Sequence, residues 1–242
     1  MKIHICNDNK VFPFLYVDDW YTPEEEKLIW KELDFYTNSS AMRRAEDSTE
    51  EDRSRPGKNE DGTFKNKAWR MDLDSTHTRR EVSHILRLQP QKMKSLEMLK
   101  AIEESGPSFR MYESSNYDVT VLNYSEGGDY YASHNDTYMI STSTWLHRTP
   151  KAYTGGDITF TDIDVTLECN HNRIVMFPSY YYHEIHPIKM EDINLASPIG
   201  WPRAAMHYLI KSWRCLMGRV CTLQATRPYV SNFALPNGNA IL

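Results

Sequence analysis

The sequence predicts a mainly β protein with flanking helices, and three observations support this fold class. The second half of the chain contains many short alternating or β-branched runs, separated by glycines and prolines. The first half contains two stretches with helical periodicity. The chain has 242 residues, 40% hydrophobic and 12% aromatic, which is enough to bury one core. The pattern favours a jelly roll or barrel preceded by a helical region.

The first predicted helix follows a short strand-like run in "FLYVDDWYTPEEEKLIWKELDFY", residues 14–36. Thr22 is a good N-cap, Pro23 suits the first turn, and Glu25 completes a capping box. The expected buried stripe of this helix consists of Leu28, Ile29, Leu33 and Phe35. A second helical stretch, residues 78–104, is expected to break near Pro90.

Residues 37–69 separate the two helical stretches and are polar, charged and nearly free of aliphatic side chains. Such a composition offers little apolar surface to bury, so a long mobile loop is expected. Two interpretations stay open for it, a lid that closes over a ligand and an insertion without a role.

From residue 108 the chain takes on the pattern of strands. In "YDVTVLNYS", residues 117–125, alternate residues fall on opposite faces. Further strand candidates are "TYMISTSTWL", "DITFTD", "VTLEC", "NRIVMFP", "YYYHEIHPI" and "RAAMHYLIKSW". We therefore expect a single domain, 1–242, with strand, helices and charged loop in 1–107, a β core in 108–213 and a tail in 214–242.

Net charge and cysteine content limit which partners and which cellular compartment are expected. The formal net charge is −5, from 33 acidic and 28 basic residues, which favours neither nucleic acid nor a membrane surface as a partner. The four cysteines (Cys6, Cys169, Cys215 and Cys221) have no CxxC spacing, which is typical of a reducing compartment. No apolar run resembles a signal core or a membrane span, so a cytoplasmic protein is expected, with its oligomeric state open.

Two separated histidine motifs predict a metal site. In "YASHNDTY", His134 and Asp136 are two residues apart, so on a strand they would share one face. Two imidazoles and one carboxylate with open positions form the facial triad of non-haem Fe(II) oxygenases. The third ligand would come from "YYYHEIHPI", as His183 or His186. Taken alone, the pair His-x-Asp fits a solvated surface strand better than a metal site. His147 and His171 are expected to be solvent-exposed.

The context of these histidines resembles a known family. "YSEGGDYYASHND" is similar to the Tyr-x-x-Gly-x-x-Tyr-x-x-His-x-Asp motif of the prolyl 4-hydroxylase-like branch of the Fe(II)/2-oxoglutarate-dependent oxygenases, with one extra residue between Tyr124 and Gly128. "TGGDITF" and "RIVMFPSYYYHEIHPI" resemble later strands of that branch. "FLYVDDWYTPEEEKLI" looks like its N-terminal strand and helix. The charged loop and the tail lie outside the resemblance.

The resemblance implies a double-stranded β-helix (jelly-roll) core with Fe(II) held by His134, Asp136 and His183. Strand parity supports His183, because His186 would then point to the opposite face. The 2-oxoglutarate co-substrate would need a cation for its distal carboxylate. Arg203 is expected there, with Lys211 and His207 as alternatives, because the gap from His183 is longer than usual for the family. Tyr124 is expected as a phenol donor to the same carboxylate.

The activity implied by the resemblance is a dioxygenase reaction. O2 and 2-oxoglutarate would be consumed, ascorbate would support the iron, and an unactivated C–H bond would be hydroxylated. The substrate expected first is a prolyl residue in a peptide or protein. A free amino acid or small metabolite is an alternative substrate. A jelly roll that binds a ligand without catalysis is the alternative from a different class of function.

Overall fold

The computed structural model describes residues 1–49, 55–149, 151–190 and 207–215, the last of these as backbone. Its helices are α1 (Pro23–Asn38), α2 (Leu73–Thr76), α3 (His84–Met93) and α4 (Leu96–Glu104), with 3-10 turns at Ala45–Asp47, Arg80–Val82 and Pro107–Tyr112. Its strands are β1 (Lys2–Cys6), β2 (Phe14–Asp18), β3 (Arg43–Arg44), β4 (Trp69–Asp72), β5 (Tyr117–Ser125), β6 (Tyr131–His134), β7 (Ile140–His147), β8 (Tyr153–Thr154), β9 (Ile158–Phe160), β10 (Val165–Leu167), β11 (Arg173–Pro178), β12 (His183–Ile185), β13 (Lys189–Met190) and β14 (His207–Cys215).

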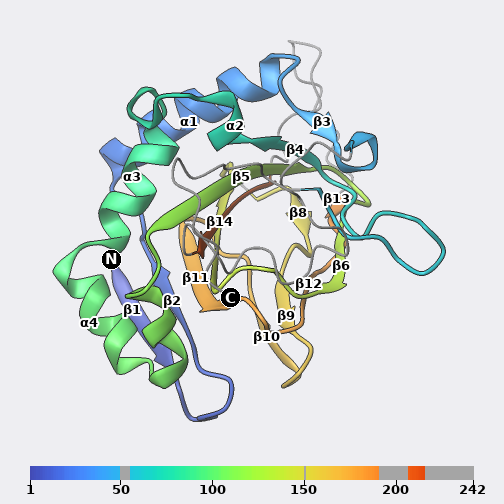
Figure 1. Cartoon of the computed structure of the whole chain (residues 1–242). Helices are drawn as coiled ribbons and strands as arrows, with labels where there is room; N and C mark the ends of the chain where they lie inside the picture. Colours follow the sequence, from blue (N-terminus) through green and yellow to red (C-terminus); the bar gives the residue numbers. More distant parts are fainter. Residues whose placement is uncertain (50–54, 150, 191–206, 216–242) are drawn as a thin grey trace, which may run out of the picture.

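Two antiparallel sheets form the core. The larger sheet has eight strands in the order β1-β2-β11-β7-β14-β5-β4-β3, and the smaller has the order β10-β9-β12-β6. Figure 1 shows the large sheet curving around, with β6, β9 and β12 opposite it. Trp145 and Phe177 from the large sheet and Phe160 and Ile185 from the small one belong to a single buried cluster. This arrangement confirms the predicted fold class, a double-stranded β-helix with flanking helices.

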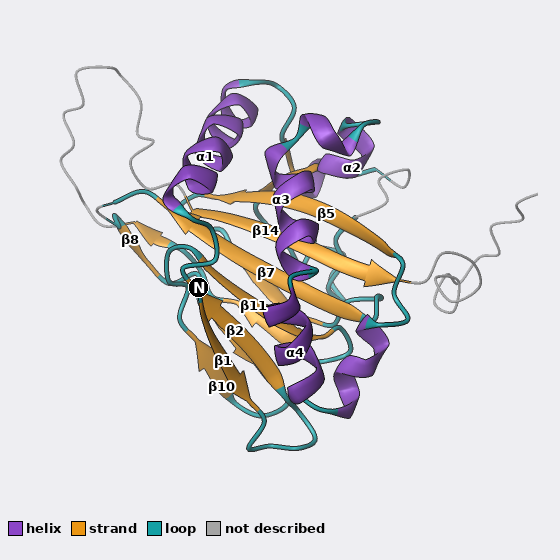
Figure 2. Cartoon of the chain, turned by 90° about the vertical axis from the view of Figure 1, so that its left-hand side faces the viewer, coloured by secondary structure: helices purple, strands orange, loops and turns teal. Residues whose placement is uncertain are grey.

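Helices cover the outer face of the large sheet, as Figure 2 shows for α1, α3 and α4. The buried Gln89 of α3 fixes this layer to the sheet. Its Oε1 accepts hydrogen bonds from Trp20 Nε1 at 3.1 Å and from the Tyr21 hydroxyl at 2.7 Å, and its Nε2 donates to Thr144 Oγ1 at 3.4 Å. Because all these groups are buried, each bond satisfies an atom that would otherwise be costly to desolvate.

Helix α1 starts where the sequence predicts, but the face that it buries differs from the predicted one. Thr22 accepts from the amide of Glu25, whose side chain accepts from the amide of Thr22, which confirms the capping box. Ile29 and Leu33 are buried as expected. The expectation for Leu28 and Phe35 was wrong, since these are 37% and 67% exposed, and Trp30 and Tyr36 are buried instead. Residues 29, 33 and 36 lie four and three apart and share a face, whereas 28 and 35 lie on the neighbouring one.

The second helical stretch breaks later than expected. Pro90 lies inside α3, and the chain leaves the helix only at Lys94 and Ser95. Ser95 then caps α4 by accepting from the amide of Met98 at 3.3 Å. The break therefore coincides with a good N-cap residue, while the proline removes a single hydrogen bond without ending the helix.

The N-terminal region also contributes strands to both edges of the large sheet. β1, which the sequence analysis missed, pairs with β2, and β4 pairs with β5 through Arg70 and Asn123. Residues 37–69 were expected as one long loop, and this was wrong for part of them. The segment includes the end of α1, strand β3, and a bridge from Asn66 to Tyr131. Residues 50–54 lie outside the described part of the chain.

Each strand candidate of the second half contains a strand, although several are shorter than the runs that predicted them. The described part of β14 ends at Cys215, two residues beyond the expected end of the core, and the remainder of the tail lies outside the described residues. Cys6 and Cys169 are free thiols. Among the described residues, no helix combines the length and apolar character needed to cross a membrane.

Candidate metal centre

Three side chains from separate parts of the chain converge inside the β-helix. His134 ends β6, His183 begins β12, and the two are direct cross-strand neighbours. His134 Nε2 lies 3.6 Å from Asp136 Oδ1, and His183 Nε2 lies 3.7 Å from Asp136 Oδ2. One donor atom from each residue can be chosen so that all lie within 4.8 Å of one another. Their side chains are 8%, 6% and 0% exposed for His134, Asp136 and His183.

Backbone carbonyls orient both imidazoles so that Nε2 faces the centre. His134 Nδ1 is 2.8 Å from the carbonyl oxygen of Ala132, and His183 Nδ1 is 3.0 Å from that of Tyr181. A carbonyl oxygen only accepts, so each Nδ1 must carry the proton. When such a ring is neutral, Nε2 carries the free lone pair, and in both histidines this nitrogen faces Asp136. An Nδ1–H bonded to a backbone carbonyl is a frequent outer-shell arrangement of metal-ligating histidines.

Asp136 reaches the centre by a route different from the expected one. The sequence analysis placed His134 and Asp136 on one strand, but β6 ends at His134 and Asp136 lies in the following loop. The Asp136 amide donates to the carbonyl of Ser179 at 2.9 Å, and Ser141 Oγ donates to Asp136 Oδ2 at 2.6 Å. Ser141 Oγ is also 2.7 Å from Ser179 Oγ. Ser141 of β7 and Ser179, in the turn that follows β11, therefore orient the carboxylate; strand alternation does not.

The remaining histidines of the sequence analysis lie elsewhere. His186 Nε2 is 2.7 Å from Thr159 Oγ1, and His186 does not belong to the donor cluster with His183. His147 and His171 were expected to be solvent-exposed, which was wrong. His147 is 9% exposed, and His171 Nε2 is 2.9 Å from Glu26 Oε1 on α1. His147 packs against Tyr153 and His171, whereas the half-buried His171 contacts α1; local sequence does not reveal either contact.

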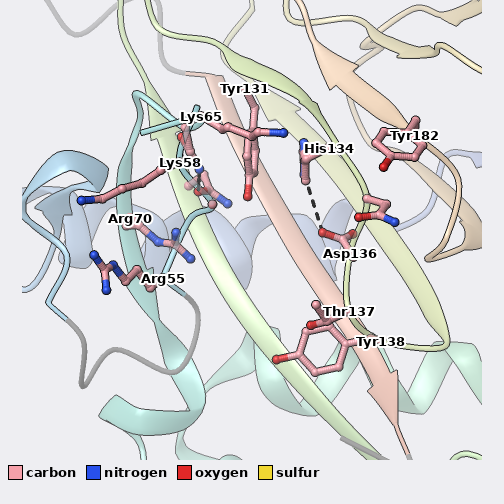
Figure 3. Close-up of a pocket in the computed structure, with 14 residues that line it drawn as sticks. Arg55, Lys58, Lys65, Arg70, Tyr131, His134, Asp136, Thr137, Tyr138 and Tyr182 are labelled. Atoms are coloured by element: carbon pink, nitrogen blue, oxygen red, sulfur yellow. Dashed lines mark hydrogen bonds and ion pairs between the residues drawn. The ribbon is translucent and has the colours of Figure 1, made fainter. Parts of the chain in front are cut away.

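A pocket of about 380 Å³ opens beside the donor cluster, and Figure 3 shows its lining. His134, Asp136 and Tyr131 form one side of it. The other side carries basic residues, among them Arg70. Asn123 also lines the pocket. Cavities of this size hold small ligands or a single side chain. The pocket therefore connects the donor cluster to a space where a polar ligand fits.

Tyr131 links the two sides of the pocket. Its ring stacks on His134, with centroids 3.6 Å apart and planes 13° from parallel. In Figure 3 its hydroxyl points between Arg70 and the His134–Asp136 pair. Burial raises the pKa of the Tyr131 phenol, the negative charge of Asp136 raises it further, and the positive charge of Arg70 opposes them. The phenol is therefore protonated at neutral pH and can donate a hydrogen bond into the pocket.

The expected anchor residues for a carboxylate are only partly described. Arg203 lies outside the described residues. The backbone of β14 places Lys211 opposite Val121 and Ser143, and His207 opposite Ser125 and His147. These register positions leave both alternatives open.

Tyr124 is not among the described residues that line the pocket, and its role as a phenol donor stays a prediction. Its ring packs against the hydrophobic cluster beneath the helices. The next residue toward the N-terminus, Asn123, lines the pocket instead. Neighbouring residues of a strand point to opposite faces, so the two side chains diverge. The alternation of "YDVTVLNYS" already contained this information.

Arg70 lines the pocket but was not predicted from the sequence. It is 8% exposed and sits on β4, in a region outside the family resemblance. No motif marks it, and β4 is a short strand without a clear alternating pattern. The available signal was weak. Arg70 stands among apolar residues in "AWRMDL", residues 68–73, and an arginine is rarely buried unless it is paired.

No protein-family model matches the sequence, and no curated protein matches it either. Solved structures do match. A prolyl-4-hydroxylase from Pseudomonas putida has a TM-score of 0.53 at 13% identity, and the match covers 88% of this chain and 97% of that chain. A prolyl hydroxylase from Trichoplax adhaerens, in complex with a hypoxia inducible factor oxygen degradation domain peptide fragment, has a TM-score of 0.54 at 10% identity, covering 84% and 83%.

A 2OG-Fe(II) oxygenase family oxidoreductase from Burkholderia pseudomallei matches with a TM-score of 0.51 at 7% identity, over 86% of this chain and 87% of that chain. This chain has the 2OG-Fe(II) oxygenase fold. At identities of 7–13%, these matches show similarity of the fold only. The chemistry of this oxygenase-fold protein depends on its own residues.

Proposed function

We propose that this chain is an Fe(II)- and 2-oxoglutarate-dependent oxygenase that hydroxylates an unactivated C–H bond, with a prolyl residue of a peptide or protein as substrate. The observation that carries the proposal is the convergence of two imidazole Nε2 atoms and one carboxylate inside a double-stranded β-helix. Fold likeness alone would fit a binding module, which has no need for such a cluster.

The donor set fits Fe(II). Two neutral imidazoles and one carboxylate, with coordination positions left for other ligands, form the ligand set of non-haem Fe(II) oxygenases. A structural zinc site would usually close with four protein ligands, and the cluster found among the described residues has three. When bound there, Fe(II) with 2-oxoglutarate and O2 would supply the oxidising chemistry, and ascorbate would keep the iron reduced.

The chain's own residues prepare that site. The carbonyls of Ala132 and Tyr181 fix which nitrogen of each imidazole faces the centre. Ser141 holds one carboxylate oxygen of Asp136. Tyr131 covers one face of His134 and keeps its own proton available as a donor. Pre-oriented groups of this kind limit the reorganisation that ligand binding and reaction demand.

The distal carboxylate of 2-oxoglutarate requires a cation in the same cavity. Arg203 remains our proposed anchor, with Lys211 and His207 as the alternatives on the strand β14. The buried Arg70, which lines the pocket together with His134 and Asp136, is a further candidate that the fold supplies. The proposal for the reaction does not depend on which of the four acts.

A prolyl substrate is supported by the kind of proteins that share the fold. Two of the matching structures are named as prolyl hydroxylases, and one of those was solved with a peptide fragment bound to it. The exposed aromatic side chain of Tyr182 at the pocket, 47% accessible, offers the sort of surface on which peptides pack. A cytoplasmic location stays our expectation from the sequence.

The test is reconstitution without oxygen, followed by turnover. The protein is loaded with Fe(II), 2-oxoglutarate and ascorbate, exposed to O2 with proline-containing peptides, and assayed for succinate and for peptides that gain one oxygen atom. We expect both products, and neither with Asp136→Ala. Hydroxylation of free amino acids alone would select the alternative substrate. Absence of bound iron and of succinate would leave a binding module.

A further inference from the structure

One wall of the pocket beside the donor cluster is strongly basic. Arg55, Lys58, Lys65 and Arg70 line it, and among the described residues of the lining Asp136 alone is acidic. Figure 3 shows the four basic side chains together on the side opposite His134 and Asp136. The chain as a whole carries a formal net charge of −5, so this concentration of positive charge departs from the background.

Contacts with the core hold the basic segment 55–66 in place. The carbonyl of Lys65 accepts from the amide of Ala132 at 2.8 Å, and Asn66 forms a bridge with Tyr131. Lys65 Nζ donates to the carbonyl of Ser133 at 2.8 Å. The segment is therefore attached directly to β6, the strand that ends at His134. Its cations are positioned relative to the donor cluster rather than tethered by a free loop.

Two cations share an aromatic platform at the outer end of this wall. Lys58 Nζ lies 4.8 Å and the Arg55 guanidinium carbon 5.6 Å from the centroid of the Phe64 ring. The lysines that form ion pairs among the described residues are Lys2 and Lys92, and neither Lys58 nor Lys65 is among them. The nearby Asp61 uses Oδ1 for the amide and hydroxyl of Thr63, at 2.9 and 2.6 Å. The positive charge of both lysines therefore remains available to a ligand.

The pocket contains more basic side chains than the co-substrate needs. Once a metal cation offsets Asp136, the distal carboxylate of 2-oxoglutarate requires one positive partner in the pocket. At least Lys58 and Lys65, on a segment of the N-terminal region, remain for a second anion. Lys58 is solvent-exposed, so the second anion would enter from the pocket mouth, as a substrate does.

We propose that the substrate presents a carboxylate next to the C–H bond that is hydroxylated, as an Asp or Glu side chain flanking the reacting residue of a peptide. This inference rests on the proposed oxygenase function and specifies its substrate class. A pocket of about 380 Å³ accepts single side chains, and the overall negative charge disfavours a long polyanion such as nucleic acid. Lys58 and Lys65 would contact the carboxylate of the flanking residue.

The test measures binding without turnover. The protein is loaded with Zn(II) in place of Fe(II) and with 2-oxoglutarate. Short fluorescein-labelled peptides carry a central proline flanked by Asp, by Asn or by Lys, and fluorescence anisotropy gives their affinities at low and high salt. We expect the Asp peptide to bind about fivefold or more tightly than the Asn peptide, and the difference to shrink with salt.

Variants of the basic wall test whether its lysines cause the preference for the Asp peptide. Lys58→Gln and the double variant Lys58→Gln/Lys65→Gln should remove most of the Asp-over-Asn preference, whereas Lys100→Gln, on the exposed surface of α4, should keep it. Lys58→Glu should shift the preference toward the Lys peptide, which loss of folding would not do. Lys58→Gln alone keeps the Lys65–Ser133 contact and guards against a folding defect.

The outcomes separate the two proposals. Equal binding of the three peptides, no binding of the Asp peptide, an unchanged preference in the double variant, or tighter binding of a single-stranded oligonucleotide of equal length would overturn the inference. Succinate formation by the Fe(II)-loaded protein is measured separately. Its absence alongside a retained Asp preference would refute the oxygenase function while leaving the acidic-peptide site in place.

Discussion

Ser141 Oγ donates a hydrogen bond to Asp136 Oδ2 at 2.6 Å, while His183 Nε2 lies 3.7 Å from that same oxygen. Ser141 belongs to the fully buried strand β7, so a rigid element of the large sheet orients a carboxylate that sits in a loop. The neighbouring Ser143 of the same strand is also buried, yet its hydroxyl has no hydrogen-bond partner among the described residues. The two serines are a matched pair for testing what the hydrogen bond contributes.

Replacing Ser141 with alanine is expected to weaken metal binding. The loss of an outer-shell partner of a ligand typically costs about 10–100-fold in affinity, because the ligand is no longer held in one orientation. Titration of the metal-free protein with Fe(II) under anaerobic conditions, or with Zn(II), measures the change. Ser143→Ala is the control and should bind metal as the wild type does. Equal affinities for both variants would mean that the Asp136 loop is fixed by its backbone bond to Ser179 alone.

His183→Ala is expected to abolish stoichiometric metal binding, while His186→Ala should retain most of it. His183 presents Nε2 to the cluster, and His186 instead contacts Thr159. Metal content after anaerobic reconstitution and desalting provides the measurement, and circular dichroism confirms folding. A His186→Ala protein that loses its metal while His183→Ala keeps it would refute the ligand assignment.

Arg203→Ala is expected to raise the KM for 2-oxoglutarate by about two to three decades. Removing one partner of a hydrogen-bonded, buried charge pair costs roughly 2–5 kcal/mol, and each 1.4 kcal/mol is about tenfold. Iron binding should survive, since Arg203 is not part of the donor cluster. Steady-state succinate formation measures KM in parallel for Arg70→Ala, Lys211→Ala and His207→Ala. A large increase in one of these, with Arg203→Ala near normal, would reassign the anchor to that residue.

The unfolding free energy of the metal-free protein should fall as the pH drops below neutrality, with His147 as one cause. Burial chiefly lowers the pKa of His147 to about 4 from its usual 6.5. In the window between these values the unfolded chain binds the proton and the folded chain does not, so acidification favours unfolding. The slope from this residue is at most about 1.4 kcal/mol per pH unit.

Urea denaturation at several pH values between about 4 and 6.5 checks this slope. His147→Gln is neutral throughout the window, so its stability should depend less steeply on pH than that of the wild type. The other histidines titrate in both proteins and cancel in the comparison. Parallel stability profiles for the two proteins would show that His147 is not held neutral by the fold.

The sequence alone determined many of the elements and the donor residues of the centre. Alternation and turn residues predicted the strands of the second half, and the Thr22–Glu25 capping box predicted the start of α1, because these signals act over a few residues. The two motifs around His134 and His183 named the residues that the fold brings together. Local patterns were sufficient wherever the physical cause was itself local.

Only the tertiary structure decided how the centre is built and what surrounds it. Asp136 is oriented by Ser141 and Ser179, which strand alternation from His134 could not predict. The basic wall from Arg55 to Arg70 faces the donor cluster because segment 55–66 attaches to β6, whose residues lie far along the chain. Such contacts depend on which strands pair, and pairing is set by the packing of the whole core rather than by any short run of residues.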